Sequence, residues 1–292
     1  MKAIPFHLPN NPNMACSKIF PGDLPEITEE IMQYLRKDFS TLYSCILVNR
    51  LWCRLAIPLL WEDPFSAPTR NYHCIKTYSC FFSEDSKAKF NEYEINDNLL
   101  ISNTLFNYPS FIKYLDIDKI CDSIKYWGGT LGMPDYDNIY LFIENNQHNS
   151  INYLTFDVDY SDNYTLYNKL SSTVLQNLGQ VLPSKLEYLC LSLIFMKSDL
   201  EIFLKNSQNT FIKKLLFRNI FIEDGNILFC IKKYIIKKER VKYLAILGVD
   251  DDVDELFSLK DEVNEFKLHN IIVQSYDDLY ISEHDYISNH LQ

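Results

Sequence analysis

The sequence predicts a mixed α/β protein, in which a small helical module precedes an irregular α+β or α/β solenoid of strand–helix units. Two observations indicate this fold class. Residues 23–65 carry apolar side chains at helical spacing, and the later chain repeats a strand-like template six times. The chain has 292 residues, 47% of them hydrophobic, and this composition is typical of a folded protein.

Four regions follow from the patterning. We expect an N-terminal tail over 1–22, a helical module over 23–65, an atypical capping unit over 66–111 and the repeat region over 112–292. The helical module opens with Asp23 as a helix cap and Pro25 in the first turn. Because so short a helical unit has a marginal core, we expect it to complete its apolar surface against a partner or the rest of the chain.

The apolar residues of 24–61 resemble an F-box, with an opening Leu-Pro, two helical stripes, a Val-x-x-x-Trp segment and a closing Leu-Trp. The string is similar to a large, expanded family of fungal F-box-like proteins, with Asn49 where many F-boxes carry Cys. The residues that carry the resemblance are Leu24, Pro25, Glu26, Ile27, Ile31, Tyr34, Leu35, Leu42, Cys45, Val48, Asn49, Arg50, Trp52, Leu55, Ala56, Pro58, Leu60 and Trp61.

This resemblance implies docking on a Skp1-like adaptor and, through it, on a cullin-RING (SCF-type) ubiquitin ligase. Leu24 and Pro25 are expected at the contact itself, and Trp61 is expected to anchor the module to the repeats. Spacing leaves open which apolar residues face Skp1 and which support the module from inside. The expected Skp1-facing or supporting set is Leu24, Pro25, Ile27, Ile31, Leu35, Leu42, Val48 and Trp52.

The repeat template places an aliphatic residue first, Leu or Phe fourth and a large apolar residue sixth. Alternation at the fourth and sixth positions predicts a strand, and the intervening segments 172–182, 198–207, 224–238 and 252–260 predict helices. Units that cannot bury their own apolar face alone are typical of a solenoid. The six copies begin at Ile112, Ile151, Leu186, Ile212, Val241 and Val263.

The repeats resemble leucine-rich repeats, with one departure. The position usually held by Asn or Cys is apolar in most copies, so the buried Asn ladder is absent and we expect a short, irregular arc. A doubly wound βαβ sheet remains the alternative, although the low glycine count, 7, removes its usual phosphate-binding function. The residues at this position are Ile120, Asp159, Ile194, Ile220, Val249 and Ile271.

The third and seventh template positions are expected to point away from the helices, toward an exposed concave face. They form a row of tyrosines with acid at one end and base at the other, and Tyr and Arg are favoured interface residues. The row could equally serve stability by cross-strand stacking. The expected partner-binding residues are Tyr114, Asp118, Tyr153, Asp157, Tyr188, Lys214, Arg218 and Tyr243.

No sequence signature of catalysis, a phosphate loop or a metal site is present, so we expect a non-enzymatic protein without cofactor or metal. The eight cysteines form no C-x-x-C pair, and no signal peptide or membrane-spanning run is apparent, which favours reduced thiols in the cytoplasm or nucleus without a membrane partner. The net charge of −11 argues against nucleic acid, although residues 205–242 hold ten basic and three acidic residues.

The function that these patterns predict is a substrate-recognition adaptor. The helical module would dock on Skp1, and the repeats would present an unknown protein substrate to the ubiquitin-charged enzyme by proximity. The alternative is a repeat-based interaction scaffold unconnected with ubiquitination. A third possibility, nucleic-acid binding through residues 231–242, would require a steeply salt-dependent affinity.

Overall fold

The structure is a computed structural model of the whole chain. It describes residues 25–65, 73–91, 104–120, 123, 151–157, 164–219, 227–236, 240–250 and 253–281. The chain divides into two compact units, Met1–Leu59 and Leu60–Gln292. The N-terminal tail lies outside the described residues, and the boundary between the units falls in the last turn of a helix.

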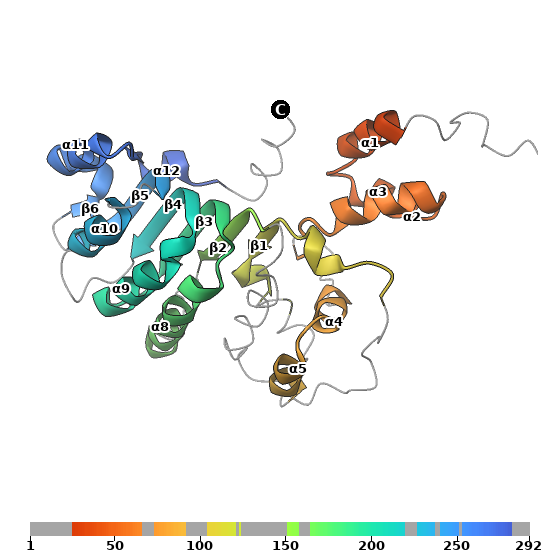
Figure 1. Cartoon of the computed structure of the whole chain (residues 1–292), viewed down its shortest axis with the longest axis horizontal. Coiled ribbons are helices and arrows are strands. Elements are labelled where there is room, and N and C mark those ends of the chain that lie inside the picture. The colour runs from red at the N-terminus through yellow and green to blue at the C-terminus, as the bar shows by residue number, and fades with distance from the viewer. Residues whose placement is uncertain are drawn as a thin grey trace, which may run out of the picture. The chain divides into compact units, whose positions relative to one another are not determined.

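The first unit, here called the helical unit, contains three short helices, α1 (Pro25–Tyr34), α2 (Phe39–Ile46) and α3 (Arg50–Leu60), in the first part of the chain in Figure 1. The helical periodicity of residues 25–60 is thereby confirmed. Met32, Leu42 and Cys45 are the most deeply buried apolar side chains of α1 and α2. One small set of buried side chains is what a unit of this length can form.

Side-chain caps set the beginnings of α2 and α3. Asp38 precedes α2, and its Oδ1 accepts a hydrogen bond from the Thr41 N–H at 3.0 Å. The Thr41 hydroxyl donates to Asp38 Oδ2 at 2.5 Å. Asn49 precedes α3 and accepts from the Trp52 N–H at 2.9 Å through Oδ1. A short polar side chain that satisfies a free helix N–H explains why Asn fits position 49.

Replacing Asp38 by Ala should lower the melting temperature of the helical unit at neutral pH and have little effect in acid. The hydrogen bonds from the Thr41 side chain and backbone hold the pKa of Asp38 below its ordinary value of 3.8. The ionised carboxylate therefore stabilises the folded state above pH 3.8, and this stabilisation is lost as the pH falls through the folded-state pKa. Thermal unfolding followed by circular dichroism at several pH values measures the difference.

Asp38→Asn is the matched control, since an amide oxygen caps a helix without titrating. The melting temperature of Asp38→Asn should be close to that of the wild-type protein at neutral pH. In acid it should be equal or higher. If Asp38→Ala lowered the melting temperature by the same amount at every pH, the charge of the carboxylate would contribute nothing to the cap.

The second unit follows with alternating helices and strands. Its described elements, in chain order, are α4 (His73–Ser79), α5 (Glu84–Asn91), η3 (Tyr108–Phe111), β1 (Tyr114–Asp116), β2 (Tyr153–Asp157), α8 (Tyr164–Val181), β3 (Lys185–Leu193), α9 (Lys197–Asn206), η4 (Ser207–Asn209), β4 (Phe211–Asn219), α10 (Leu228–Ile235), β5 (Val241–Asp250), β6 (Val253–Glu255), η6 (Leu256–Ser258), α11 (Lys260–Leu268), β7 (Ile272–Val273) and α12 (Tyr276–Leu279).

The strands form one sheet in chain order, β1-β2-β3-β4-β5, with each neighbouring pair parallel. β7 continues the parallel order against β5, and β6 pairs antiparallel with the far end of β5. The fourth template positions of the first five copies lie in register across the sheet and are fully buried, and Val273 of β7 continues their row at 7% exposure. The five are Leu115, Leu154, Leu189, Leu215 and Leu244.

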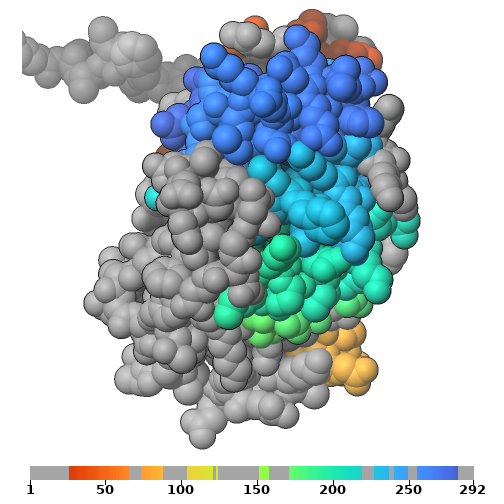
Figure 2. Space-filling model, turned by 90° about the vertical axis from the view of Figure 1, so that its left-hand side faces the viewer, coloured from red at the N-terminus to blue at the C-terminus, as the bar shows by residue number. Residues whose placement is uncertain are grey.

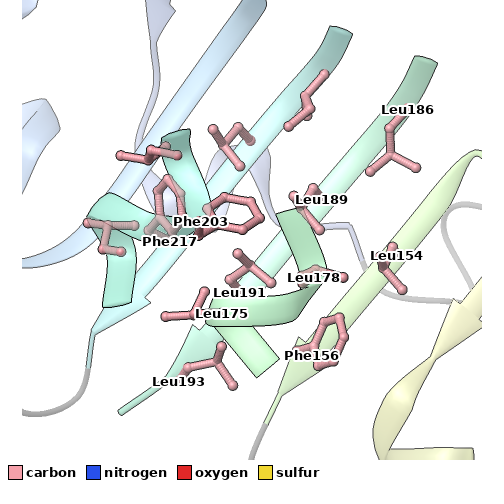
Figure 3. Packing of buried hydrophobic residues seen from close by; sticks show 14 of the residues in the cluster. Leu154, Phe156, Leu175, Leu178, Leu186, Leu189, Leu191, Leu193, Phe203 and Phe217 are labelled. Atoms are coloured by element: carbon pink, nitrogen blue, oxygen red, sulfur yellow. The ribbon is translucent and has the colours of Figure 1, made fainter. Parts of the chain in front are cut away.

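Helices α8, α9 and α10 cover one face of this sheet (Figure 1), where their apolar side chains join the fourth- and sixth-position residues in the main core. Figure 3 shows Leu175 and Leu178 of α8 and Phe203 of α9 over the leucines and phenylalanines of β2, β3 and β4. In Figure 2 the colours of these segments succeed one another in sequence order, so each strand–helix unit lies beside the next. The mixed α/β arrangement with a parallel sheet is therefore confirmed.

The capping unit contributes to the same core. Cys74, Ile75 and Tyr78 of α4 are buried among its residues, as is Phe82. Trp61 packs on Tyr108 of η3 with ring centroids 4.4 Å apart, within the second unit. Helix α4 and Phe82, within the described part of residues 66–111, therefore belong to the main core.

The sequence places five strands correctly, at Ile112, Ile151, Leu186, Ile212 and Val241, but the strand expected at Val263 and the helix expected over 252–260 are wrong. Residues 253–255 form β6, and Val263 lies in helix α11. Phe266 is fully buried while Leu268 is 82% exposed, which is the pattern of a helix and not of the template strand.

The last parallel strand begins only after α11 ends. Asn270 adopts a left-handed conformation with φ 59°, and the Ile271 N–H donates to the Phe266 carbonyl at 3.2 Å, which closes the helix. Ile271 and Val273 are buried and Ile272 is half exposed, so the alternation that predicts a strand resides here.

The far end of β5 bends where β6 turns back on it. Gly248 has φ 76°, a conformation that favours glycine, and it lies within the register shift between Leu247 and Asp250. β6 pairs with β5 on both sides of this bulge, at Leu247 and Asp250, whereas β7 pairs with the earlier residues Tyr243 and Leu244.

Candidate functional site

The described members of the predicted docking set differ in burial. Ile27 and Val48 are 45% and 57% exposed, whereas Leu42 is fully buried. Ile31, Leu35 and Trp52 are partly buried. Leu24 and the side chain of Pro25 lie outside the described residues. The structure therefore separates candidates for direct contact, Ile27 and Val48, from Leu42, which supports the helical unit from inside.

Further apolar side chains of the helical unit are exposed and were not in the predicted set. Tyr34 follows Ile27 by two helical turns on α1, and Tyr43 precedes Leu47 by one turn. We call the six residues together the exposed apolar set. Its members are Ile27, Tyr34, Tyr43, Leu47, Val48 and Leu51, with exposures of 37 to 89%.

The predicted tyrosine row exists on the sheet face opposite helices α8–α10. Tyr114, Tyr153 and Tyr188 lie in register on β1, β2 and β3, followed by Lys214 on β4 and Tyr243 on β5. The first two rings stack with centroids 4.1 Å apart, and the rings of Tyr153 and Tyr188 stack at 4.3 Å and 4°. The assignment of template positions to the two faces is correct.

The expected exposure of this row is wrong for its three stacked tyrosines. Tyr114, Tyr153 and Tyr188 are only 1 to 2% exposed. They belong to a second buried cluster that also includes Cys190, Tyr276 and Leu279. The covering residues come from the segment after β7, here called the C-terminal strap and defined as residues 275–281.

The strap crosses the sheet from β5 to β2. It follows the last backbone bond to the sheet, from the Gln274 N–H to the Leu244 carbonyl at 3.0 Å. At its far end, the Ile281 N–H donates to the Tyr188 hydroxyl at 3.2 Å, and the Tyr153 hydroxyl donates to the Ile281 carbonyl at 2.5 Å. Two tyrosine hydroxyls thus hold both backbone groups of one residue.

The start of the strap is held by side chains of β6 and β3 and by a cap from its own Ser275. The Tyr276 N–H is bound by Glu255 of β6, and the Tyr276 hydroxyl lies 3.2 Å from the Cys190 sulfur. The Ser275 hydroxyl accepts from the Asp278 N–H at 3.2 Å and caps α12. Burial raises the pKa of Tyr276 far above its ordinary value and that of the Cys190 thiol to about 11, so both stay protonated at neutral pH.

The rest of the predicted partner-binding set lies around the strap. Arg218 is exposed, while Asp118, Asp157, Lys214 and Tyr243 are partly exposed. Asp157, Ser192 and Arg218 are in register on β2, β3 and β4, so acid and base lie at the same level of the sheet. Burial, with Lys213 nearby, lowers the pKa of Lys214.

Several basic residues of 231–242 are already engaged. Lys232 forms ion pairs with Glu262 and Glu265, and Lys233 lies 2.6 Å from Glu201. Arg240 is 4% exposed and donates to the Ser207 carbonyl at 2.6 Å. These side chains are therefore not presented to a phosphate backbone.

Within the described ranges, no group of three or more His, Cys, Asp or Glu side chains could hold a metal ion. In the same part of the chain, every helix is too short or too polar to cross a bilayer.

Sequence reasoning missed the strap, although a signal for it was present. Tyr276 and Leu279 stand one helical turn apart on either side of Asp277 and Asp278, and this spacing indicates an apolar face to be buried. What they pack against could not be read from that spacing.

Comparison with protein-family models, with curated proteins and with solved structures finds no match to this chain.

Proposed function

We propose that this chain is a non-catalytic adaptor of an SCF-type ubiquitin ligase, located in the cytoplasm or nucleus. The helical unit would dock on a Skp1-like protein, which links it to a cullin-RING assembly. The second unit would hold a protein substrate, and its role would be to raise the substrate's effective concentration near a ubiquitin-charged enzyme.

The exposed apolar set carries this proposal. Six large apolar side chains of this unit, on α1, α2, α3 and the turn between α2 and α3, are exposed, and this supports the proposal because contiguous exposed apolar surface is typical of interaction sites. Two of them, Ile27 and Val48, belong to the string that resembles an F-box. Tyr34, Tyr43, Leu47 and Leu51 extend the surface that a partner could cover.

The second unit suits substrate presentation because of its architecture. Parallel strands in strict chain order, with helices along one face, are compatible with a short solenoid like that of leucine-rich repeats. A repeated array of this kind has one continuous face for a protein ligand, and here the face opposite the helices is lined by the tyrosine row beneath the C-terminal strap.

The double variant Ile27→Ser/Val48→Ser should lose co-purification with Skp1 from the same source, by about tenfold or more in affinity, because central apolar contacts dominate binding energy. Both side chains are about half exposed, so the chain should remain folded by circular dichroism. Affinity capture and titration calorimetry with purified Skp1 measure the loss.

Phe211→Ser/Phe229→Ser is the matched control, since these side chains are 40% and 69% exposed on the second unit. It should bind Skp1 like the wild type. Undiminished capture by the Ile27→Ser/Val48→Ser variant would contradict docking through this surface. Failure of the wild-type chain to bind Skp1, together with a stable homodimer in sedimentation, would favour the alternative of a self-associating interaction scaffold.

A further inference from the structure

The strap is packed on one side only. Tyr276 and Leu279 are 6% and 1% exposed, whereas Asp277, Asp278 and Tyr280 between and after them point to solvent. An apolar pair three residues apart on one helical turn is how a short peptide presents a single face. The strap therefore resembles a bound ligand more than a further layer of the fold.

The strap makes no strand of the sheet. Among the described residues, its own backbone–backbone bonds join Leu279 to Ser275 and Tyr280 to Tyr276, both within the strap. The sheet holds it through side chains alone. A segment with a few buried side chains and no ladder bonds is the kind that opens without global unfolding.

The sheet recognises peptide backbone beneath the strap. Tyr188 and Tyr153 use their hydroxyls as acceptor and donor for the N–H and carbonyl of Ile281. These two groups are present in any non-proline residue, so the pair accepts an extended residue of another chain equally well. Next to it, the surface formed by Cys190, Leu216 and Ala245 takes apolar and aromatic side chains.

We propose that the sheet face lined by Tyr153, Tyr188 and Cys190 is a binding surface for short aromatic–aliphatic peptide segments, and that the C-terminal strap occupies it as an internal ligand. This rests on the proposed function, because a protein substrate would use the surface by displacing the strap. The partner segment would place an aromatic ring near Cys190, an aliphatic side chain beside it and a backbone residue on the two hydroxyls.

Cys190 reports whether the strap opens, because its thiol lies beneath Tyr276. Cys74 is the internal reference: it is buried in the other core cluster, and burial raises its pKa to about 12. Alkylation of the full chain by N-ethylmaleimide, resolved by residue in mass spectrometry, should modify Cys190 at least about tenfold faster than Cys74, since local opening requires less free energy than global unfolding.

Leu279→Ser should raise the Cys190 rate further and leave the Cys74 rate unchanged. Leu268→Ser is the matched control, because that leucine is 82% exposed on α11, and neither rate should change. If the Leu279→Ser chain unfolds, the Cys74 rate will rise as well. The test then uses the wild-type chain, whose Cys190 alkylation rate is compared with and without peptide.

A synthetic peptide of residues 274–284 should protect Cys190 in both the wild-type and the Leu279→Ser chain, and bind the latter in fluorescence anisotropy. The same peptide carrying Leu279→Ser should not. Adding Tyr153→Phe to the Leu279→Ser chain should weaken peptide binding about fivefold, the effect of one net hydrogen bond. Tyr234→Phe, which removes a hydroxyl bonded to Glu201 on the helix side, should leave it unchanged.

Equal, slow alkylation of Cys190 and Cys74 in the wild type, or a peptide without effect on Cys190, would overturn the inference and make the strap a fixed part of the core. Skp1 capture is tested with variants at other residues, Ile27 and Val48. A fixed strap together with intact Skp1 binding would therefore refute this inference alone, and lost Skp1 binding with an opening strap would refute only the adaptor.

Discussion

Replacing Phe217 by Ala should lower the free energy of unfolding by about 3–5 kcal/mol, the range for a phenylalanine truncated in a core. Phe217 of β4 is fully buried at the centre of the sheet. Its ring lies 6.4 Å from that of Phe195 and 6.3 Å from that of Phe203, both edge to face. The strand cannot move to fill the space, because β3 and β5 hold it on both sides. Urea denaturation followed by circular dichroism measures the change.

Phe229→Ala is the matched control, since this ring on α10 is 69% exposed. Its effect should stay within about 0.5 kcal/mol, as for most surface substitutions. A loss below about 1 kcal/mol for Phe217→Ala would mean that the packing of α9 on the sheet is looser than these contacts indicate.

Replacing Gly179 by Ala should lower the free energy of unfolding by about 1–3 kcal/mol, the typical cost of overpacking. A Cβ at this position of α8 would lie 2.7 Å from the Phe203 carbonyl oxygen, 2.9 Å from Asn206 Cβ and 3.1 Å from the Ser207 nitrogen. Two of these atoms are backbone, so relief requires α8 to move away from α9. The sign is informative, because the same change at an open helix position stabilises by up to about 1 kcal/mol.

Gln180→Ala tests the neighbouring, exposed position of the same helix and should change stability by less than about 0.5 kcal/mol. Differential scanning calorimetry of both variants measures the contrast. A Gly179→Ala chain as stable as the wild type would show that α8 and α9 can separate at their closest approach without loss.

The fold could be predicted from the sequence to the extent that it depends on local alternation. The spacing of Leu189 and Leu191 predicts a strand and its buried face within one short segment, and the same spacing recurs at Leu215 and Phe217. The error at Val263 arises because Val-x-x-Phe fits both the template and one helical turn. A strand of two residues, Ile272–Val273, gives too few positions to correct it.

Burial of the tyrosine row could not be predicted in this way. The hydrogen bond from Tyr153 to Ile281 joins residues 128 positions apart, and the sequence around Tyr153 does not indicate that a later segment covers it. The same limit applies to the helical unit, where spacing puts Leu42 and Val48 in one apolar set and only the packing shows that the first is buried and the second exposed.

The lengths of the strands affect how readily the sheet edges of two copies of this chain could pair. The central strands β3, β4 and β5 have nine, nine and ten residues, whereas the outer strands β1 and β7 have three and two. Of the ten residues of β5, the end beyond the Gly248 bulge is paired with β6 rather than with β7. Long strands with free backbone edges recruit strands from other molecules and seed aggregates. By ending the described sheet in strands too short to serve as such templates, this chain gains protection against edge-to-edge polymerisation while its long strands remain paired inside.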